Sequence, residues 1–171
     1  MTPPHIFLVG PMGAGKTTVG KHLATLLTRQ FIDVDAEIES RAGADVPWIF
    51  DMEGEEGFRD RESKVLSEIV DKTQPLVIAT GGGVVLREEN RRILRKGTVV
   101  YLSATVDQLV ERTARDKNRP LLQVEDREAV IRQLIEKRDP LYREVADLVC
   151  PSSSRQPQKL AKKLAEELSA L

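Results

Sequence analysis

One segment constrains this chain more than any other, the sequence GPMGAGKT at residues 10–17. It matches the phosphate-loop pattern G-x-x-x-x-G-K-[ST] and lies between a short apolar run and a stretch with helical spacing. Glycines let the backbone wrap around phosphate oxygens, and the N–H groups that open a helix supply positive potential. In such loops the lysine, here Lys16, reaches the β- and γ-phosphates, and the hydroxyl, here that of Thr17, binds Mg²⁺. A plain glycine turn needs neither side chain, so the full motif predicts nucleotide binding without deciding between kinase, ATPase and GTPase.

Short β-rich runs alternate with longer charged stretches of helical spacing along the chain. The expected strands are residues 6–9, 31–34, 76–79, 98–102 and 148–150. The expected helices are residues 16–27, 55–70, 88–94, 106–114, 125–137 and 157–168. This alternation predicts βαβ units and a mainly parallel sheet in an α/β fold. The runs at 6–9 and 76–79 lack polar alternation, which is typical of central strands covered on both faces.

Charge and cysteine content narrow the classes of partner. Lys and Arg together number 26 and Asp and Glu number 27, so the basic excess of a general nucleic-acid or membrane-surface binder is missing. The single cysteine, Cys150, excludes an intrachain disulfide. No apolar run is long enough for a signal sequence or a membrane span. We expect a cytoplasmic protein that binds neither nucleic acid nor a membrane.

Two carboxylates end the second expected strand, in the segment FIDVD at 31–35. Because residues i and i+2 of a strand point to the same face, Asp33 and Asp35 are expected to project together. Ligands of open α/β sheets bind beyond the carboxyl ends of the strands. One carboxylate is therefore a candidate for holding a water on Mg²⁺, and the other for accepting the proton of an attacking hydroxyl. Two simpler interpretations stay open: Asp35 as the N-cap of the next helix, and Asp33 as a solvated strand end.

Arg59 is a candidate for binding an acidic group. It follows the segment GEEGF at 54–58 near the start of an expected helix, and Glu62 comes three residues later. That spacing lets Glu62 pair with Arg59 and hold its guanidinium fork, which suits bidentate recognition of a carboxylate. The alternative is an exposed ion pair, which would contribute little.

Three glycines, Gly81, Gly82 and Gly83, directly follow Thr80 and the third expected strand. They allow the backbone to approach a ligand closely, although a flexible turn is the alternative. No aspartate ends this strand, so the usual second carboxylate of a nucleotide site is missing there. This favours Asp33 for the metal role.

Two later segments carry further arginines. A basic segment begins at Arg112 and ends in RPLL at 119–122. Such a run is usually a solvated helix face, but near a triphosphate it could form a lid that lowers an arginine onto the transferring phosphate. Further on, RDPLY at 138–142 is expected to break a helix at its proline and place Arg138 at a bend.

With these residues placed, the chain resembles the bacterial shikimate kinases, a family of P-loop small-molecule kinases. The likeness extends from Ile6 to Leu148. It rests on GPMGAGKT, F-x-D-x-D-x-x-I-E at 31–39, GEEGFRDRE at 54–62, TGGG at 80–83, RPLL at 119–122 and R-x-P-L-Y-x-x-x-A at 138–146. The phosphate loop is shared by a very large superfamily, whereas the combination of the other motifs is specific. Thr17 replaces a serine that is often found there, which keeps the hydroxyl.

The resemblance implies a P-loop NTPase three-layer sandwich, with a five-stranded parallel sheet flanked by helices in one domain, 1–171. It implies a substrate-binding segment at 33–62 and a mobile lid at 112–125. The activity that it implies is transfer of the γ-phosphoryl group of ATP, with Mg²⁺, to the 3-hydroxyl of shikimate. We expect the protein to act as a monomer.

The motifs also imply residue roles. For the nucleotide these are Gly10, Gly13, Ala14, Gly15, Lys16, Thr17, Thr18, Arg112, Arg119 and Arg155. Arg112 is expected to stack on adenine, and Arg155 with Pro157 to form the far side of that pocket. For the substrate they are Asp35, Arg59, Gly81, Gly82, Gly83 and Arg138, with the arginines on its carboxylate and Asp35 on its hydroxyls. Thr17 and Asp33 are implied for the metal, and Lys16, Asp35 and the lid residue Arg119 for catalysis.

Three rival functions are weighed against this expectation. Gluconate-type and nucleoside monophosphate kinases would share the loop and the lid but should lack Arg59 and Arg138 together with F-x-D-x-D. A GTP-binding switch would normally carry N-K-x-D after a strand. The one similar segment, EKRD at 136–139, begins with glutamate and lies in a stretch with helical spacing.

Overall fold

Five short strands form one parallel sheet in the computed structural model, which describes residues 4–114, 120–152 and 156–171. The strands are β1 (Ile6–Val9), β2 (Gln30–Asp33), β3 (Leu76–Ala79), β4 (Thr98–Ser103) and β5 (Leu148–Pro151). Their order is β2-β3-β1-β4-β5, and every neighbouring pair is parallel. β1 and β3 are fully buried, whereas the edge strands β2 and β5 are partly exposed. The α/β fold, the parallel sheet and the central place of these two strands are confirmed.

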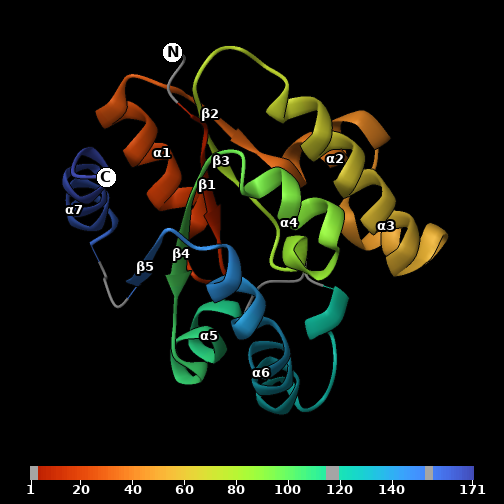
Figure 1. Ribbon diagram of the computed structural model, residues 1–171. Coiled ribbons are helices and arrows are strands. Elements are labelled where there is room, and N and C mark those ends of the chain that lie inside the picture. Colours follow the sequence, from red (N-terminus) through yellow and green to blue (C-terminus); the bar gives the residue numbers. More distant parts are fainter. Residues whose placement is uncertain (1–3, 115–119, 153–155) are drawn as a thin grey trace.

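Alternate residues of each central strand supply two separate apolar cores, one on each face of the sheet. In β1, Ile6 and Leu8 point to one face, and Phe7 and Val9 to the other. The first face is covered by α1 (Lys16–Leu27) and α7 (Pro157–Ser169), and the second by α2 (Val34–Ala42), α3 (Val46–Val70) and α4 (Glu88–Leu94) (Figure 1). The result is a three-layer sandwich.

A third, smaller apolar cluster lies near the carboxyl ends of the strands. It joins α5 (Val106–Thr113), α6 (Arg127–Val145) and the short 3₁₀ helix η2 (Pro120–Leu122). Leu109, Leu122 and Ile131 are its buried members. A second 3₁₀ helix, η1 (Val84–Leu86), follows the triple glycine. This cluster therefore anchors the described end of the expected lid segment, 120–125, to the body of the protein.

Two expectations about the elements are wrong, and one helical stretch was not predicted. α6 continues through Pro140 to Val145 because Tyr142 and Val145 are buried in the core, and their burial offsets the hydrogen bond that proline removes. A helical stretch also precedes Gly54 within α3, where the left-handed φ of that glycine, 73°, bends the chain. The second strand ends at Asp33, and Val34 already begins α2.

Candidate active site

The phosphate loop joins β1 to α1, as its sequence context predicts. Gly13 and Gly15 have φ values of 86° and 91°, a left-handed conformation that other residues rarely adopt. The Lys16 Nζ atom donates hydrogen bonds to the backbone oxygens of Gly10, at 2.6 Å, and of Pro11, at 3.0 Å. Its ammonium group is thus held above the loop, where a phosphate would meet both it and the N-terminus of α1.

Thr17 and Asp33 lie together beside this loop. The Thr17 hydroxyl donates to Asp33 Oδ2 at 2.7 Å, and the other carboxylate oxygen accepts from the backbone N–H of Ala36 at 3.1 Å. Asp33 is therefore the N-cap of α2, and the interpretation of Asp35 as that cap is wrong. A hydroxyl and a carboxylate at this spacing offer Mg²⁺ two oxygen ligands, and the ion commonly keeps several waters besides.

Asp35 lies in the first turn of α2 and not on a strand, so the argument from strand alternation is wrong for it. Asp33 and Asp35 nevertheless line the same cleft, which has a volume of about 290 Å³. The predicted residues that line it are Gly13, Gly15, Lys16, Thr17, Thr18, Asp33, Asp35, Gly81 and Gly82. The first turn of the helix brings the carboxylate to the place that an extended strand was expected to reach.

Arg59 and Glu62 form a buried ion pair on α3. Arg59 Nη1 donates to Glu62 Oε1 at 3.0 Å, and the exposed fractions of the two residues are 6% and 0%. The alternative of an exposed surface pair is therefore wrong. Burial raises the pKa of Glu62, Arg59 lowers it, and the nearby Asp35 raises it again, with a net upward shift.

Arg138 brings a second buried guanidinium to the same place from α6, with an exposed fraction of 3%. Among the described residues, Arg59 Nε, Arg138 Nε and Glu62 Oε2 are buried without a hydrogen-bond partner. Buried polar atoms in native proteins are nearly always paired. Two unpaired guanidinium N–H groups at one site therefore indicate a place for an acceptor such as a carboxylate.

Each glycine of the triple glycine faces one of these charged side chains. A β-carbon at Gly81 would lie 2.9 Å from Asp35 Oδ1, and one at Gly82 would lie 3.4 Å from Arg138 Nη1. A β-carbon at Gly83 would overlap the Arg59 guanidinium. Side chains packed against the turn therefore require glycine at these positions. The alternative interpretation, a turn that needs glycine only for flexibility, does not account for these contacts.

These groups border a smaller cavity of about 40 Å³. It is lined by Met12, Asp35, Val46, Phe50, Phe58, Arg59, Gly81, Gly82, Gly83, Pro120, Leu121 and Arg138. Part of the lining is aromatic, with Phe50 and Phe58 in ring contact at 5.0 Å between centroids. Asp35, Arg59 and Arg138 supply the charges, and the Arg59 guanidinium lies over the Phe58 ring, 5.2 Å from its centroid. Such a cavity suits a small ring compound with a carboxylate at one end and hydroxyls elsewhere.

A third cavity, of about 170 Å³, adjoins the phosphate loop on its far side. It is lined by Ala14, Gly15, Thr18, Val19, Arg112, Ser152, Pro157 and Leu160. Arg112 donates from Nη2 to the Ser152 backbone oxygen at 2.6 Å and from Nη1 to the Gly13 oxygen at 3.2 Å. Its position beside the cavity fits the expected adenine pocket, whereas stacking on the base stays a prediction.

Two of the predicted residues, Arg119 and Arg155, lie outside the described residues. The expectation of a mobile lid at 112–125 falls partly on 115–119, which are likewise not described, and stays a prediction.

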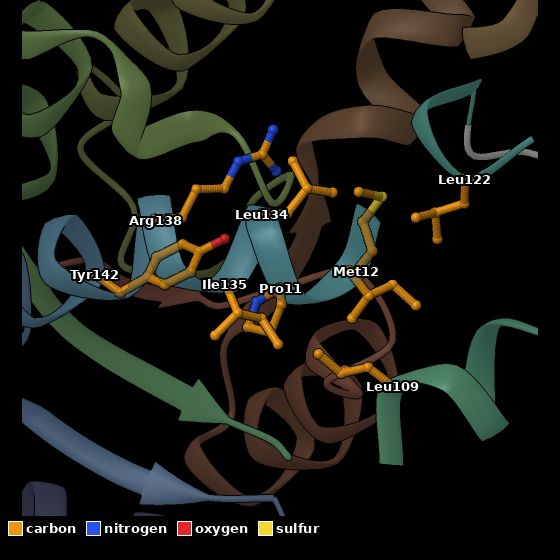
Figure 2. Close-up of a pocket in the computed structure, with 9 residues that line it drawn as sticks. Pro11, Met12, Leu109, Leu122, Leu134, Ile135, Arg138 and Tyr142 are labelled. Carbon is orange, nitrogen blue, oxygen red and sulfur yellow. The ribbon is translucent and has the colours of Figure 1, made fainter. Parts of the chain in front are cut away.

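A fourth cavity is small and apolar, with a volume of about 20 Å³, and lies between the phosphate loop, α5 and α6 (Figure 2). Its wall is mostly aliphatic, formed by Leu109, Leu122, Ile131, Leu134 and Ile135. Arg138 and the neighbouring Tyr142 close its polar end.

Sequence reasoning missed several residues of these clefts. Glu39 lines the main cleft and accepts the Val46 N–H at 2.8 Å. One helical turn separates it from Asp35, a spacing that could have indicated its place. Phe50 was missed because the helical stretch before Gly54 was not predicted, and Ser152 carries no sequence signal.

Comparison with known proteins now identifies the family. The family model described as shikimate kinase matches residues 12–169. A shikimate kinase of Chromohalobacter salexigens is 53% identical over 98% of this chain and 93% of its own length. The chain belongs to the shikimate kinase family. It is therefore a transferase that moves phosphoryl groups, built on a P-loop nucleotide-binding fold.

Solved structures agree with this placement in the shikimate kinase family. The shikimate kinase of Acinetobacter baumannii, solved in complex with shikimate, superimposes with a TM-score of 0.96 at 52% identity, over 99% of this chain and 94% of that one. A gluconokinase from Sinorhizobium meliloti superimposes with a TM-score of 0.56 at 16% identity, over 99% and 97% of the two chains, which shows a shared fold alone. Within the described ranges, no helix is long and apolar enough to cross a membrane.

Proposed function

We propose that the chain transfers the γ-phosphoryl group of ATP to the 3-hydroxyl of shikimate. The observation that carries this proposal is that two buried arginines and the carboxylate of Asp35 line one cavity at the glycine turn. Each of these arginines has an Nε without a hydrogen-bond partner among the described residues. Shikimate has one carboxylate and several hydroxyls, and it needs donors for the first and an acceptor for the second.

Arg59 and Arg138 bind the substrate carboxylate in this proposal. Both are almost fully buried, so their charges act with little screening by water. Glu62 holds Arg59 through their 3.0 Å ion pair, while the buried Arg59 Nε has no hydrogen-bond partner among the described residues. The aromatic wall of Phe50 and Phe58 packs against the ring, which fixes its orientation.

Asp35 accepts the proton of the attacking hydroxyl. Its Oδ1 atom lies against Gly81, at the point where the substrate cavity meets the main cleft, since it lines both. A carboxylate in this place also orients the hydroxyl toward the nucleotide phosphates. Phosphoryl transfer through a loose transition state depends on such positioning and on charge neutralisation, so no covalent nucleophile is required.

The nucleotide is held by the phosphate loop. Lys16 faces the β- and γ-phosphates, and the cavity beside Arg112 and Ser152 receives adenine. Thr17 and Asp33 would hold Mg²⁺, Asp33 through a water, because they present two oxygens 2.7 Å apart at the cleft wall. When bound, the ion neutralises negative charge on the phosphates. Arg119 is proposed for the transferring phosphoryl group from the family resemblance, together with the lid at 112–125.

The competing functions are separated by one assay. ADP release is measured with shikimate, gluconate or AMP as acceptor, each at the same concentration. We expect turnover with shikimate alone. Gluconate has a carboxylate and hydroxyls but no rigid ring to pack on Phe50 and Phe58, and AMP has no carboxylate for Arg59 and Arg138. Faster turnover with gluconate or AMP would contradict the proposal, and acceptor-independent hydrolysis would contradict a kinase function.

A further inference from the structure

Tyr142 is a buried polar residue to which the proposed function gives no task. Its exposed fraction is 1%, and it lies one helical turn after Arg138 on α6. Residues spaced in this way share a helix face. Both side chains line the same small cavity as Pro11 and Met12 of the phosphate loop (Figure 2).

The Tyr142 hydroxyl donates a hydrogen bond to the backbone oxygen of Gly82, the middle residue of the triple glycine. The Arg138 guanidinium reaches the same residue, since its Nη1 would lie 3.4 Å from a β-carbon at Gly82. Two side chains of one helix therefore meet the substrate turn at a single residue.

The protonation state of Tyr142 suits this contact. Burial raises its pKa to about 12, although the charge and hydrogen bonding of Arg138 oppose the rise. The phenol is therefore protonated near neutral pH and can donate to Gly82. Its oxygen keeps lone pairs on the side of Arg138.

α6 lacks one hydrogen bond in the turn that carries Arg138. Pro140 has no N–H to donate to the backbone oxygen of Glu136, four residues earlier. The hydrogen bond from Tyr142 to Gly82, one turn later, adds a restraint between this helix and the glycine turn.

We propose that Tyr142 is a positioning residue for the substrate carboxylate: its hydroxyl links Gly82 to Arg138 and holds the guanidinium at the substrate cavity that Arg138 lines. The inference rests on the carboxylate-binding role proposed for Arg138.

The chain offers a matched control in Tyr101. Its ring packs on that of Tyr142, with centroids 4.9 Å apart, and its hydroxyl donates to Asp139 Oδ1 at 2.6 Å. Tyr101→Phe therefore removes the same atom from an adjacent buried ring, without touching Gly82 or Arg138.

The test compares three proteins: wild type, Tyr142→Phe and Tyr101→Phe. For each, we measure the dissociation constants for shikimate and for its methyl ester, and also kcat and the KM for ATP. The ester keeps every hydroxyl but loses the negative charge. Tyr142→Phe should weaken shikimate binding roughly tenfold, as expected for a lost hydrogen bond that supports a charged group, and leave ester binding within about twofold. Its kcat and KM for ATP should change little, and Tyr101→Phe should match wild type throughout. Equal weakening for acid and ester would overturn the inference, because it would indicate a general structural role.

Arg138→Met separates this inference from the proposed function. If Arg138→Met keeps the preference for the acid over the ester, the carboxylate role of Arg138 fails, and the inference fails with it. If Arg138→Met loses the preference while Tyr142→Phe keeps it, the inference alone is overturned.

If the Tyr142→Phe protein does not fold, a spectroscopic measurement on a protein that keeps Tyr142 tests the inference instead. The chain has two tyrosines, so Tyr101→Phe leaves Tyr142 as the single site for 3-fluorotyrosine. Its ¹⁹F resonance should shift when shikimate binds and shift less with the methyl ester. Identical responses to both ligands, or no response to either, would overturn the inference.

Discussion

The Arg59 guanidinium lies against Gly83 so closely that a β-carbon at position 83 would overlap it. The same guanidinium donates a hydrogen bond to Glu62 at 3.0 Å. Its position in the substrate cavity is therefore set jointly by an ion pair and by the absence of a side chain on the glycine turn.

Gly83→Ala should displace Arg59 and weaken shikimate binding. Disturbing a desolvated charge contact costs about 2 kcal/mol or more, which corresponds to an increase of at least roughly thirtyfold in the KM for shikimate. The KM for ATP should stay within about twofold, because the phosphate loop is untouched. Steady-state kinetics with each substrate varied in turn measures both values.

Gly43→Ala is the matched control for this change. Gly43 has a φ of 67° and open space around the place of a β-carbon, so alanine there introduces backbone strain without a clash. It should lower the melting temperature and leave the KM for shikimate unchanged. An equal rise in that KM for both variants would contradict the steric account.

Asp33→Asn tests the metal role apart from the helix cap. Asparagine caps helices about as well as aspartate, so α2 should keep its N-terminus while the cleft loses a negative charge. We expect the Mg²⁺ concentration for half-maximal rate to rise about tenfold or more, as for the loss of a group that supports a metal ligand. Thr17→Ser keeps the hydroxyl and should behave as wild type. A Mg²⁺ dependence that does not change in Asp33→Asn would remove Asp33 from the metal site.

Asp35→Asn should lower kcat by about 10²–10⁴, the range for losing a general base. The helix should be unaffected, since Asp33 provides its cap. Glu37→Gln changes another carboxylate of α2 that lines none of the described clefts, and its kcat should match wild type. A kcat for Asp35→Asn close to wild type would leave the attacking hydroxyl without this acceptor.

Stability should depend on pH through Glu62. Because its pKa is raised in the folded protein, the folded state binds its proton more tightly than the unfolded state does. The resulting stability is complete below the unfolded pKa, near that of ordinary glutamate, and is lost as pH rises through the folded value. Relative to Glu62→Gln, the free energy of unfolding of wild type should therefore fall as pH rises from this region. Urea unfolding of both proteins over a pH series measures their free energies of unfolding. If the free energy of unfolding of wild type, relative to that of Glu62→Gln, rose with pH, the result would contradict this prediction.

The fold was predictable because its local signals agree with one another. The runs of β1 and β3 are apolar throughout, as two-sided burial requires, and the phosphate loop marks the junction of β1 with α1. Prediction was wrong where tertiary packing overrode a local rule. Pro140 does not end α6, because Tyr142 and Val145 are buried beyond it.

The site was predictable only as far as its residues carry motifs. Arg59, Arg138 and the triple glycine were predicted, but their contacts needed the packing of α3 and α6 on the glycine turn. Whether Asp33 or Asp35 caps α2 depended on which residue is the first of that helix, and element boundaries are the least certain part of a prediction from sequence.

The most direct test is to identify the phosphorylated product by NMR. The protein is incubated with Mg²⁺, ATP and shikimate, and ³¹P–¹H correlation then locates the new phosphate ester. We predict equimolar ADP and a single ester at the 3-hydroxyl, with a rate at least about a hundredfold lower for Lys16→Met, which loses the charge above the phosphate loop. An ester at another hydroxyl, no ester at all, or an undiminished rate in a folded Lys16→Met protein would contradict the account.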